Sequence, residues 1–183
     1  DFEERLKAVV KAITAVGGNA SVVSATGNIL VGSVTAAGNI VTLAATSGAL
    51  TDNNGVGLNV TAASTTLTAE TGIASSGDPL DTNVAAITSA TAANGGVFLS
   101  ETDAVTIGVV SSSGANADIA IANLAGNIDI TGGTVTAGGA GSDIAISSAG
   151  STTLGGLTAV GDTVTITAGT SIVDAAGVAI TAA

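Results

Sequence analysis

Carboxylates are the side chains of this sequence that could do acid–base chemistry. The chain has no histidine and no cysteine, which removes the usual nucleophile–base pairs and most transition-metal sites. A glycoside hydrolase needs two carboxyl groups about 5–10 Å apart. Glu101 and Asp103 would project to the same side of a strand, and Asp78 and Asp81 form a second pair. No aromatic platform for a sugar accompanies either pair, so we expect solvated or turn acids and no catalytic residues.

One glycine-rich turn resembles a calcium motif. Residues 138–143, GGAGSD, match the opening of the nonapeptide GGxGxDxUx, in which turn carbonyls and the aspartate bind calcium between coils. The position for a large apolar residue holds Ala145, and the motif occurs once where a working site needs tandem copies. We therefore expect Asp143 to lie in an ordinary glycine turn, and we expect no metal or cofactor.

Alternating threonines form a third chemical pattern. Flat Thr-x-Thr ladders on a β-solenoid are the ice-binding face of some proteins, and there the ladders repeat at one register on every coil. The sequence spacing here shows no such register, so the simpler interpretation is that threonine is a good solvent-facing strand residue. The alternating sets are Thr66 and Thr68, Thr134 and Thr136, and Thr163, Thr165 and Thr167.

The charge distribution excludes several partners. The net charge is −11, and the three basic residues, Arg5, Lys7 and Lys11, all lie near the N-terminus. Phosphate contacts need lysine or arginine, so the rest of the chain would repel nucleic acid and anionic membrane surfaces. There is no run of about 18 or more apolar residues, and the first residues do not resemble a signal peptide. If the parent protein is secreted, we expect its signal to lie outside this chain.

The composition favours β structure with a narrow core. Apolar residues make up 46% of the chain, but aromatic residues make up only 1%. The core must therefore consist of Ala, Val, Ile and Leu, and the many Val, Ile and Thr residues favour a pleated surface. An antiparallel sandwich usually has longer strands and large aromatic side chains, so we favour another all-β architecture.

The apolar residues of the N-terminal segment recur with the period of a helix. Residues 1–14 place apolar side chains on one helical stripe, with the charges on the opposite side, and Gly17 and Gly18 provide a stop. We therefore predict that residues 1–18 form an amphipathic helix and turn that cap the first coil of the domain. The stripe comprises Phe2, Leu6, Val9, Val10 and Ile13.

From residue 19 the apolar period changes to two, in short bursts entered through a turn residue. The bursts recur in a unit near twenty residues, which is typical of a solenoid whose coils bury their faces by stacking. We predict a parallel β-helix over residues 19–183, with residues 75–79 forming a loop that leaves the coil. The bursts begin at Asn28, Asn39, Asp103, Asp118, Asn127, Asp143 and Asp162.

Five segments of this region share a recognisable cadence: GALTD at 48–52, LNVTA at 58–62, TLTAETGI at 66–73, LDT at 80–82 and GGVFL at 95–99. They resemble the repeats of filamentous-haemagglutinin-like exoproteins and related giant surface proteins. The resemblance covers roughly residues 19–183, by cadence and not by an invariant motif. It implies a right-handed parallel β-helix, exported through the outer membrane by a dedicated partner or as an autotransporter passenger, and it supplies no catalytic residues.

These observations predict a structural or adhesive module at a bacterial cell surface or outside the cell, with no catalysis. Its expected partners are neighbouring repeats of a longer parent or other copies joined end to end, and surface glycans or host proteins. Nucleic acid and membrane insertion are not expected. The alternative is a carbohydrate-active β-helix that binds or hydrolyses glycans, and below it an ice-binding solenoid.

Overall fold

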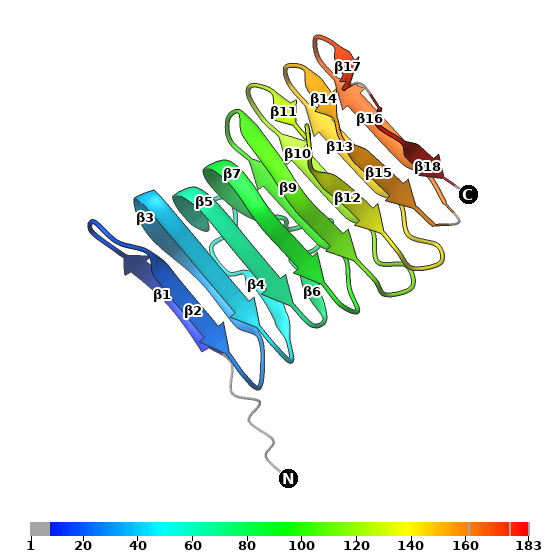
Figure 1. The fold of residues 1–183 in the computed structure, drawn as a ribbon. Helices are drawn as coiled ribbons and strands as arrows, with labels where there is room; N and C mark the ends of the chain where they lie inside the picture. Colours follow the sequence, from blue (N-terminus) through cyan, green and yellow to red (C-terminus); the bar gives the residue numbers. More distant parts are fainter. Residues whose placement is uncertain (1–7, 161, 176, 183) are drawn as a thin grey trace.

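The computed structural model describes residues 8–160, 162–175 and 177–182. Within these residues the chain is a parallel β-solenoid of about eight turns, and Figure 1 shows the coils stacked in one continuous row. The described part contains strands and no helix, so it has no helix long and apolar enough to cross a membrane. The strands are β1 (Ala8–Thr14), β2 (Ala20–Ser24), β3 (Ile29–Ala45), β4 (Ala49–Asp52), β5 (Val60–Ala69), β6 (Gly72–Ile73), β7 (Leu80–Ala92), β8 (Val97–Glu101), β9 (Val105–Ser112), β10 (Ile119–Asn123), β11 (Ile128–Asp129), β12 (Thr134–Ala137), β13 (Ile144–Ser148), β14 (Thr152–Leu154), β15 (Gly156–Ala159), β16 (Val164–Ala168), β17 (Ile172–Asp174) and β18 (Ile180–Ala182).

Every pairing between the strands is parallel, and the pairings build three faces. Face A runs through β8, β10, β13 and β16. Face B runs through the start of β9 and then β11, β14 and β17. Face C runs through β2, the ends of β3, β5, β7 and β9, and then β12, β15 and β18. The long strands of the first half bend and so serve more than one face.

Aliphatic side chains fill the interior in columns. Because neighbouring side chains of a strand point to opposite sides, every second residue enters the coil and lies against its equivalent in the next coil. One such column on face A is fully buried and would contribute about 1.5–3 kcal/mol for each side chain before entropy is deducted. It comprises Ile29, Leu50, Ile73, Val97, Ile119 and Ile144.

A glycine column forms the corner between faces B and C in the second half. A Cβ atom at Gly133 would lie 2.1 Å from the carbonyl oxygen of Ile107, and one at Gly155 would lie 2.1 Å from that of Ile130. The backbones of successive coils therefore approach too closely at this corner for any side chain, which explains why the turns are rich in glycine.

Asparagine and aspartate side chains in the turns link each coil to the next. The Oδ1 atom of Asn28 accepts a hydrogen bond from the backbone N–H of Ala49 at 3.0 Å, and that of Asn127 accepts one from Ser151 at 2.8 Å. The partners are 21 and 24 residues apart. These bonds explain why a polar turn residue precedes so many of the aliphatic bursts.

The predicted N-terminal capping helix is wrong where the structure describes it. Ala8–Thr14 is strand β1, which pairs in parallel with β3 through Val10 to Val31 and Ile13 to Val34. Residues 1–7, with Phe2 and Leu6, lie outside the described residues. The β-branched side chains of this segment suit a strand as well as a helix, and pairing with β3 satisfies the backbone groups along one edge of β1. The solenoid therefore includes β1, so among the described residues the predicted boundary after residue 18 does not mark a change in the kind of structure.

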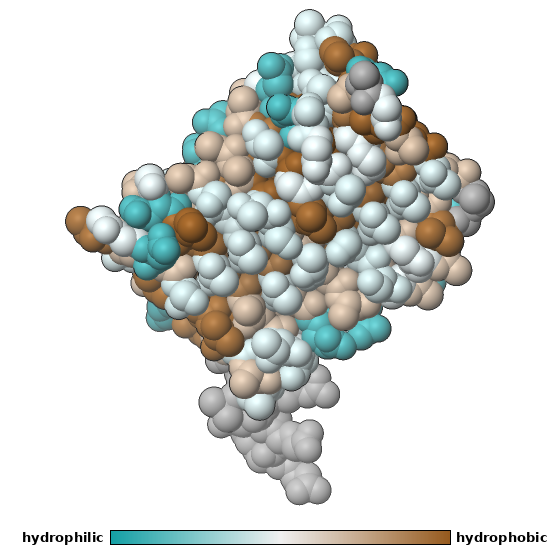
Figure 2. Space-filling model, viewed as in Figure 1, coloured by the Kyte–Doolittle hydropathy of each residue, from teal (hydrophilic) through white to brown (hydrophobic). Residues whose placement is uncertain are grey.

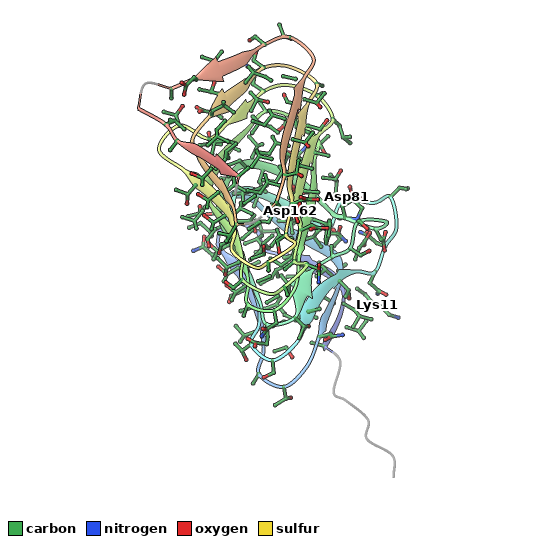
Figure 3. All side chains as sticks on the ribbon, turned by 90° about the vertical axis from the view of Figure 1, so that its right-hand side faces the viewer. Lys11, Asp81 and Asp162 are labelled. Atoms are coloured by element: carbon green, nitrogen blue, oxygen red, sulfur yellow. The ribbon has the colours of Figure 1, made fainter. Side chains whose placement is uncertain are left out.

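Two loops leave the coil on face A. The predicted loop at residues 75–79 is confirmed, since β6 ends at Ile73 and β7 begins at Leu80. A second loop, at residues 53–59 between β4 and β5, was not predicted. Figure 3 shows the latter segment projecting sideways from the stack, on the side where Asp81 and Lys11 are labelled.

Candidate functional site

The expectation that Glu101 and Asp103 project to the same side of a strand is wrong. Glu101 is the last residue of β8 and its side chain lies inside the coil, with 0% of its surface exposed. Asp103 lies in the following turn and is exposed. A substrate at the surface could not contact both carboxyl groups, so this pair has no hydrolytic geometry.

Glu101 is held by donors from the neighbouring coil and from its own turn. Its Oε2 atom accepts a hydrogen bond from the hydroxyl of Thr82 at 2.5 Å, and its Oε1 atom accepts from the backbone N–H groups of Val84 at 3.1 Å and Thr102 at 3.0 Å. Burial raises the pKa of Glu101 above its ordinary value of 4.5, while the hydrogen bonds act in the opposite direction. The carboxyl group therefore joins two coils from within.

Glu101 belongs to a polar column inside face A. Thr82, Glu101, Asn123 and Ser148 follow one another in register in successive coils, and all four are buried. The same column begins with Val34 and Val60 in the preceding coils. The interior thus changes from aliphatic to polar along the stack, a feature that alternation in the sequence did not reveal.

Asp78 and Asp81, the second candidate pair, lie near a third acid, Asp52. The pKa of Asp78 is raised, first by the negative charge of Asp52 and also by Asp81, so the three acids lie near one another. Figure 3 labels Asp81 on the side of the stack where the loop projects. Asn59 donates to the Oδ1 atom of Asp52 at 2.6 Å, and the N–H of Asn54 donates to it at 2.8 Å. Asp52 therefore fastens the loop at residues 53–59.

Asp143 is hydrogen-bonded to the neighbouring coils on both sides. Its Oδ1 atom accepts a hydrogen bond from the N–H of Thr163 at 2.9 Å, and its own N–H donates to Asp118 at 3.0 Å. Contact with the carboxyl group of Asp143 raises the pKa of Asp162, which Figure 3 labels. Within the described ranges, no group of three or more acidic, histidine or cysteine side chains could hold a metal ion.

Two of the three threonine sets share one register, which the sequence-based interpretation did not expect. Two outward columns run along face C, and we call their serine and threonine residues the hydroxyl face. The sets at 66 and 68 and at 134 and 136 belong to it, whereas Thr165 and Thr167 lie on β16 of face A. One column contains Thr68, Thr91, Ser111, Thr136, Thr158 and Thr181, and the other contains Thr42, Thr66, Ser89 and Thr134, with Val109 between the last two.

The register was hidden in the sequence because coil length varies. Neighbouring coils are offset by 20 residues at Asp143 and Thr163, and by 25 at Asp118 and Asp143. The extra residues lie in turns and loops, so the strands still stack in line. A bulge at Thr88 makes a similar adjustment within β7, where the pairing with β5 shifts between Thr65 and Thr66.

The hydroxyl face is uncharged. None of its positions carries an acid or a base, and Figure 2 shows a broad pale area there, with strongly hydrophilic residues toward the margins. One margin has a hollow of about 280 Å³ beside Thr68, Thr91 and Ser111, in which Glu70 is the single acid. Glu70 accepts a hydrogen bond from the side chain of Asn94 at 2.6 Å, so the hollow has no second carboxylate for hydrolysis.

Comparison of the chain with protein-family models, curated proteins and solved structures finds no match. The fold itself defines the class: this is a repeat protein with a parallel β-solenoid, whose surface offers columns of hydroxyl groups and scattered acids.

Proposed function

We propose that the chain is a structural and adhesive module of a bacterial cell-surface or secreted protein, built from repeats of the filamentous-haemagglutinin-like kind. The observation that carries this proposal is the continuous stack, in which each coil pairs in register with the next. Each added coil lengthens such a stack by about 4.8 Å, so a solenoid converts sequence length into reach. We further propose that the coils wind to the right, as parallel strand crossovers almost always do.

The last described coil supports stacking against further coils. Ile172 and Ile180 occupy columns that are buried one coil earlier, at Thr152 and Leu157. Ile172 is nevertheless 50% exposed and Ile180 is 48% exposed. An open aliphatic cross-section with free strand edges invites edge-to-edge pairing, and its occupant would be a neighbouring repeat or another copy of the chain.

The charge pattern is compatible with a location outside the cell. Lys11 is the one basic residue in the described part of the chain, so trypsin finds few sites there, and the acids keep the particle soluble. The carbohydrate-active alternative gains no support, because Glu101 is buried and Asp52, the acid beside Asp78 and Asp81, is hydrogen-bonded to Asn54 and Asn59 of a loop.

The test is the concentration dependence of assembly. Sedimentation velocity on the full chain should show end-to-end oligomers that grow with concentration, and electron microscopy should show rods one solenoid wide. Ile180→Asp places a charge in the open cross-section and should abolish this growth. Ile40→Asp is the matched control, since Ile40 is 43% exposed on the outside of β3. A wild-type chain that stays monomeric at every concentration would contradict end-to-end stacking.

A further inference from the structure

We propose that the hydroxyl face binds ice. The proposal assigns a ligand to one side of the solenoid and does not depend on the stacking of its ends. It follows from the arrangement of the side chains, from their free hydrogen-bonding groups and from the absence of charge among them.

The arrangement is two parallel columns, of which one is continuous and the other is interrupted at Val109 and Gly156. Successive coils are spaced by about 4.8 Å, and alternate residues along a strand are spaced by about 6.7 Å. The column from Thr68 to Thr181 carries a hydroxyl group in six successive coils without a gap. Figure 1 shows the strands of this face lying side by side and nearly parallel. Both columns carry hydroxyl groups on β5, β7 and β12. There the face can hold water molecules at regular intervals in both directions, as the surface of an ice crystal does.

The hydroxyl groups are free to bind that water. Across the described residues, no hydroxyl of this face makes a hydrogen bond to another protein group, whereas Thr46, Ser47 and Thr102 at the turns all donate to backbone carbonyls. A hydroxyl group can donate one hydrogen bond and accept two, which matches the bonding of water in a crystal.

The composition of the face favours ice over other neutral surfaces. Each threonine adds a methyl group beside its hydroxyl, and no charge is present to impose a different hydration shell. An aromatic platform, which would favour sugar rings, is lacking on this face, because Phe98 lies on β8 of face A. An uncharged lattice of hydroxyl and methyl groups is thus complementary to an uncharged lattice of water.

The face is also rigid before it binds. Its backbone is hydrogen-bonded to the coils above and below, and the β-branched threonine side chain has few rotamers. Little conformational entropy is therefore lost on binding, which favours affinity for a fixed lattice.

The experiment measures the partition of the full chain into growing polycrystalline ice, together with thermal hysteresis. The wild-type chain should enter the ice and show hysteresis. Thr134→Tyr places a bulky ring in the hydroxyl face and should abolish both effects. Thr106→Tyr is the matched control and should abolish neither, because Thr106 is also an exposed strand threonine but lies on face B of the preceding coil.

Circular dichroism must show that each variant keeps its β-sheet spectrum. If Thr134→Tyr does not fold, Thr68→Tyr tests the other column, since Thr68 is exposed as well. The proposal is overturned if the wild-type chain is excluded from ice, even if it adsorbs to crystalline cellulose or dimerises through this face. It is also overturned if Thr106→Tyr loses as much ice binding as Thr134→Tyr. None of these results affects the sedimentation test of Ile180→Asp.

Discussion

The hydroxyl of Thr82 donates a 2.5 Å hydrogen bond to the carboxyl group of Glu101 inside the solenoid, across the boundary between two coils. The burial of this carboxyl group, which outweighs the hydrogen bond, predicts how stability depends on pH. Burial raises the pKa of Glu101 above 4.5, so the folded chain binds the proton more tightly than the unfolded chain. The favourable contribution of Glu101 is present in acid and is lost as the pH rises through the raised pKa.

Glu101→Gln removes the titration and keeps an acceptor for Val84 and Thr102. We expect the free energy of unfolding of the wild type, relative to this variant, to increase as the pH falls from 7 toward 4.5. Urea denaturation at several pH values measures the difference, and a difference that is constant with pH would contradict the buried position. Glu101→Leu leaves buried donors without an acceptor and should cost about 1–3 kcal/mol for each such group.

The solenoid could be predicted from the sequence because the signals for its strands lie within each strand and the turn before it. Short aliphatic bursts entered through asparagine or aspartate identify strands whatever lies between them, and Asn127 and Asp143 do link coils as part of that pattern. The burial of Glu101 could not be predicted, because it depends on Thr82 and Val84 of another coil as its partners. The hydroxyl face was missed for a related reason: the sequence offset between coils varies, while the spatial register does not.

The helix predicted for Ala8–Thr14 was wrong because the local pattern fits two structures. Val9, Val10 and Ile13 fit the stripe of a helix and also the alternation of a strand. A parallel partner in β3 decides the outcome, and a pairing with a residue about twenty positions away is not visible in a window of fourteen residues.

A second prediction concerns the two acids in contact at the corner of face A. Asp143→Asn keeps an Oδ1 acceptor for Thr163 but removes the carboxyl group whose hydrogen bond and negative charge raise the pKa of Asp162. We expect the pKa of Asp162 to fall toward 3.8, its ordinary value, as measured by NMR titration of its carboxyl carbon. Asp129→Asn, on face B, should leave the pKa of Asp162 unchanged. An unaltered Asp162 in the Asp143 variant would show that the two carboxyl groups are not in contact.

A third prediction concerns the core. Ile121 is 1% exposed and lies between Leu99 and Ile146 in its column. Ile121→Ala removes buried atoms that the neighbouring coils cannot replace, so it should lower the free energy of unfolding by about 2–5 kcal/mol. The same substitution at Ile40, which is 43% exposed, should cost less than about 0.5 kcal/mol. Equal effects at the two positions, measured by urea denaturation, would be inconsistent with the assigned inside and outside of the coil.

The last prediction compares Gly133, at the corner between faces B and C, with Gly18, which lies in a turn. A Cβ at Gly133 would lie 2.1 Å from the carbonyl oxygen of Ile107 and 2.6 Å from that of Gly108. Both contacts are with backbone, so Gly133→Ala must push two coils apart and break ladder hydrogen bonds. We expect a loss of about 2 kcal/mol or more in the free energy of unfolding.

At Gly18 a Cβ would meet nothing within 4 Å, so Gly18→Ala should be neutral, or stabilising by up to about 1 kcal/mol, because alanine has less freedom in the unfolded chain. Thermal unfolding of the two variants side by side measures the contrast. If Gly133→Ala were as stable as Gly18→Ala, the backbones of successive coils could not approach as closely at this corner as the structure places them, and the tight stacking that aligns the three faces would need another cause.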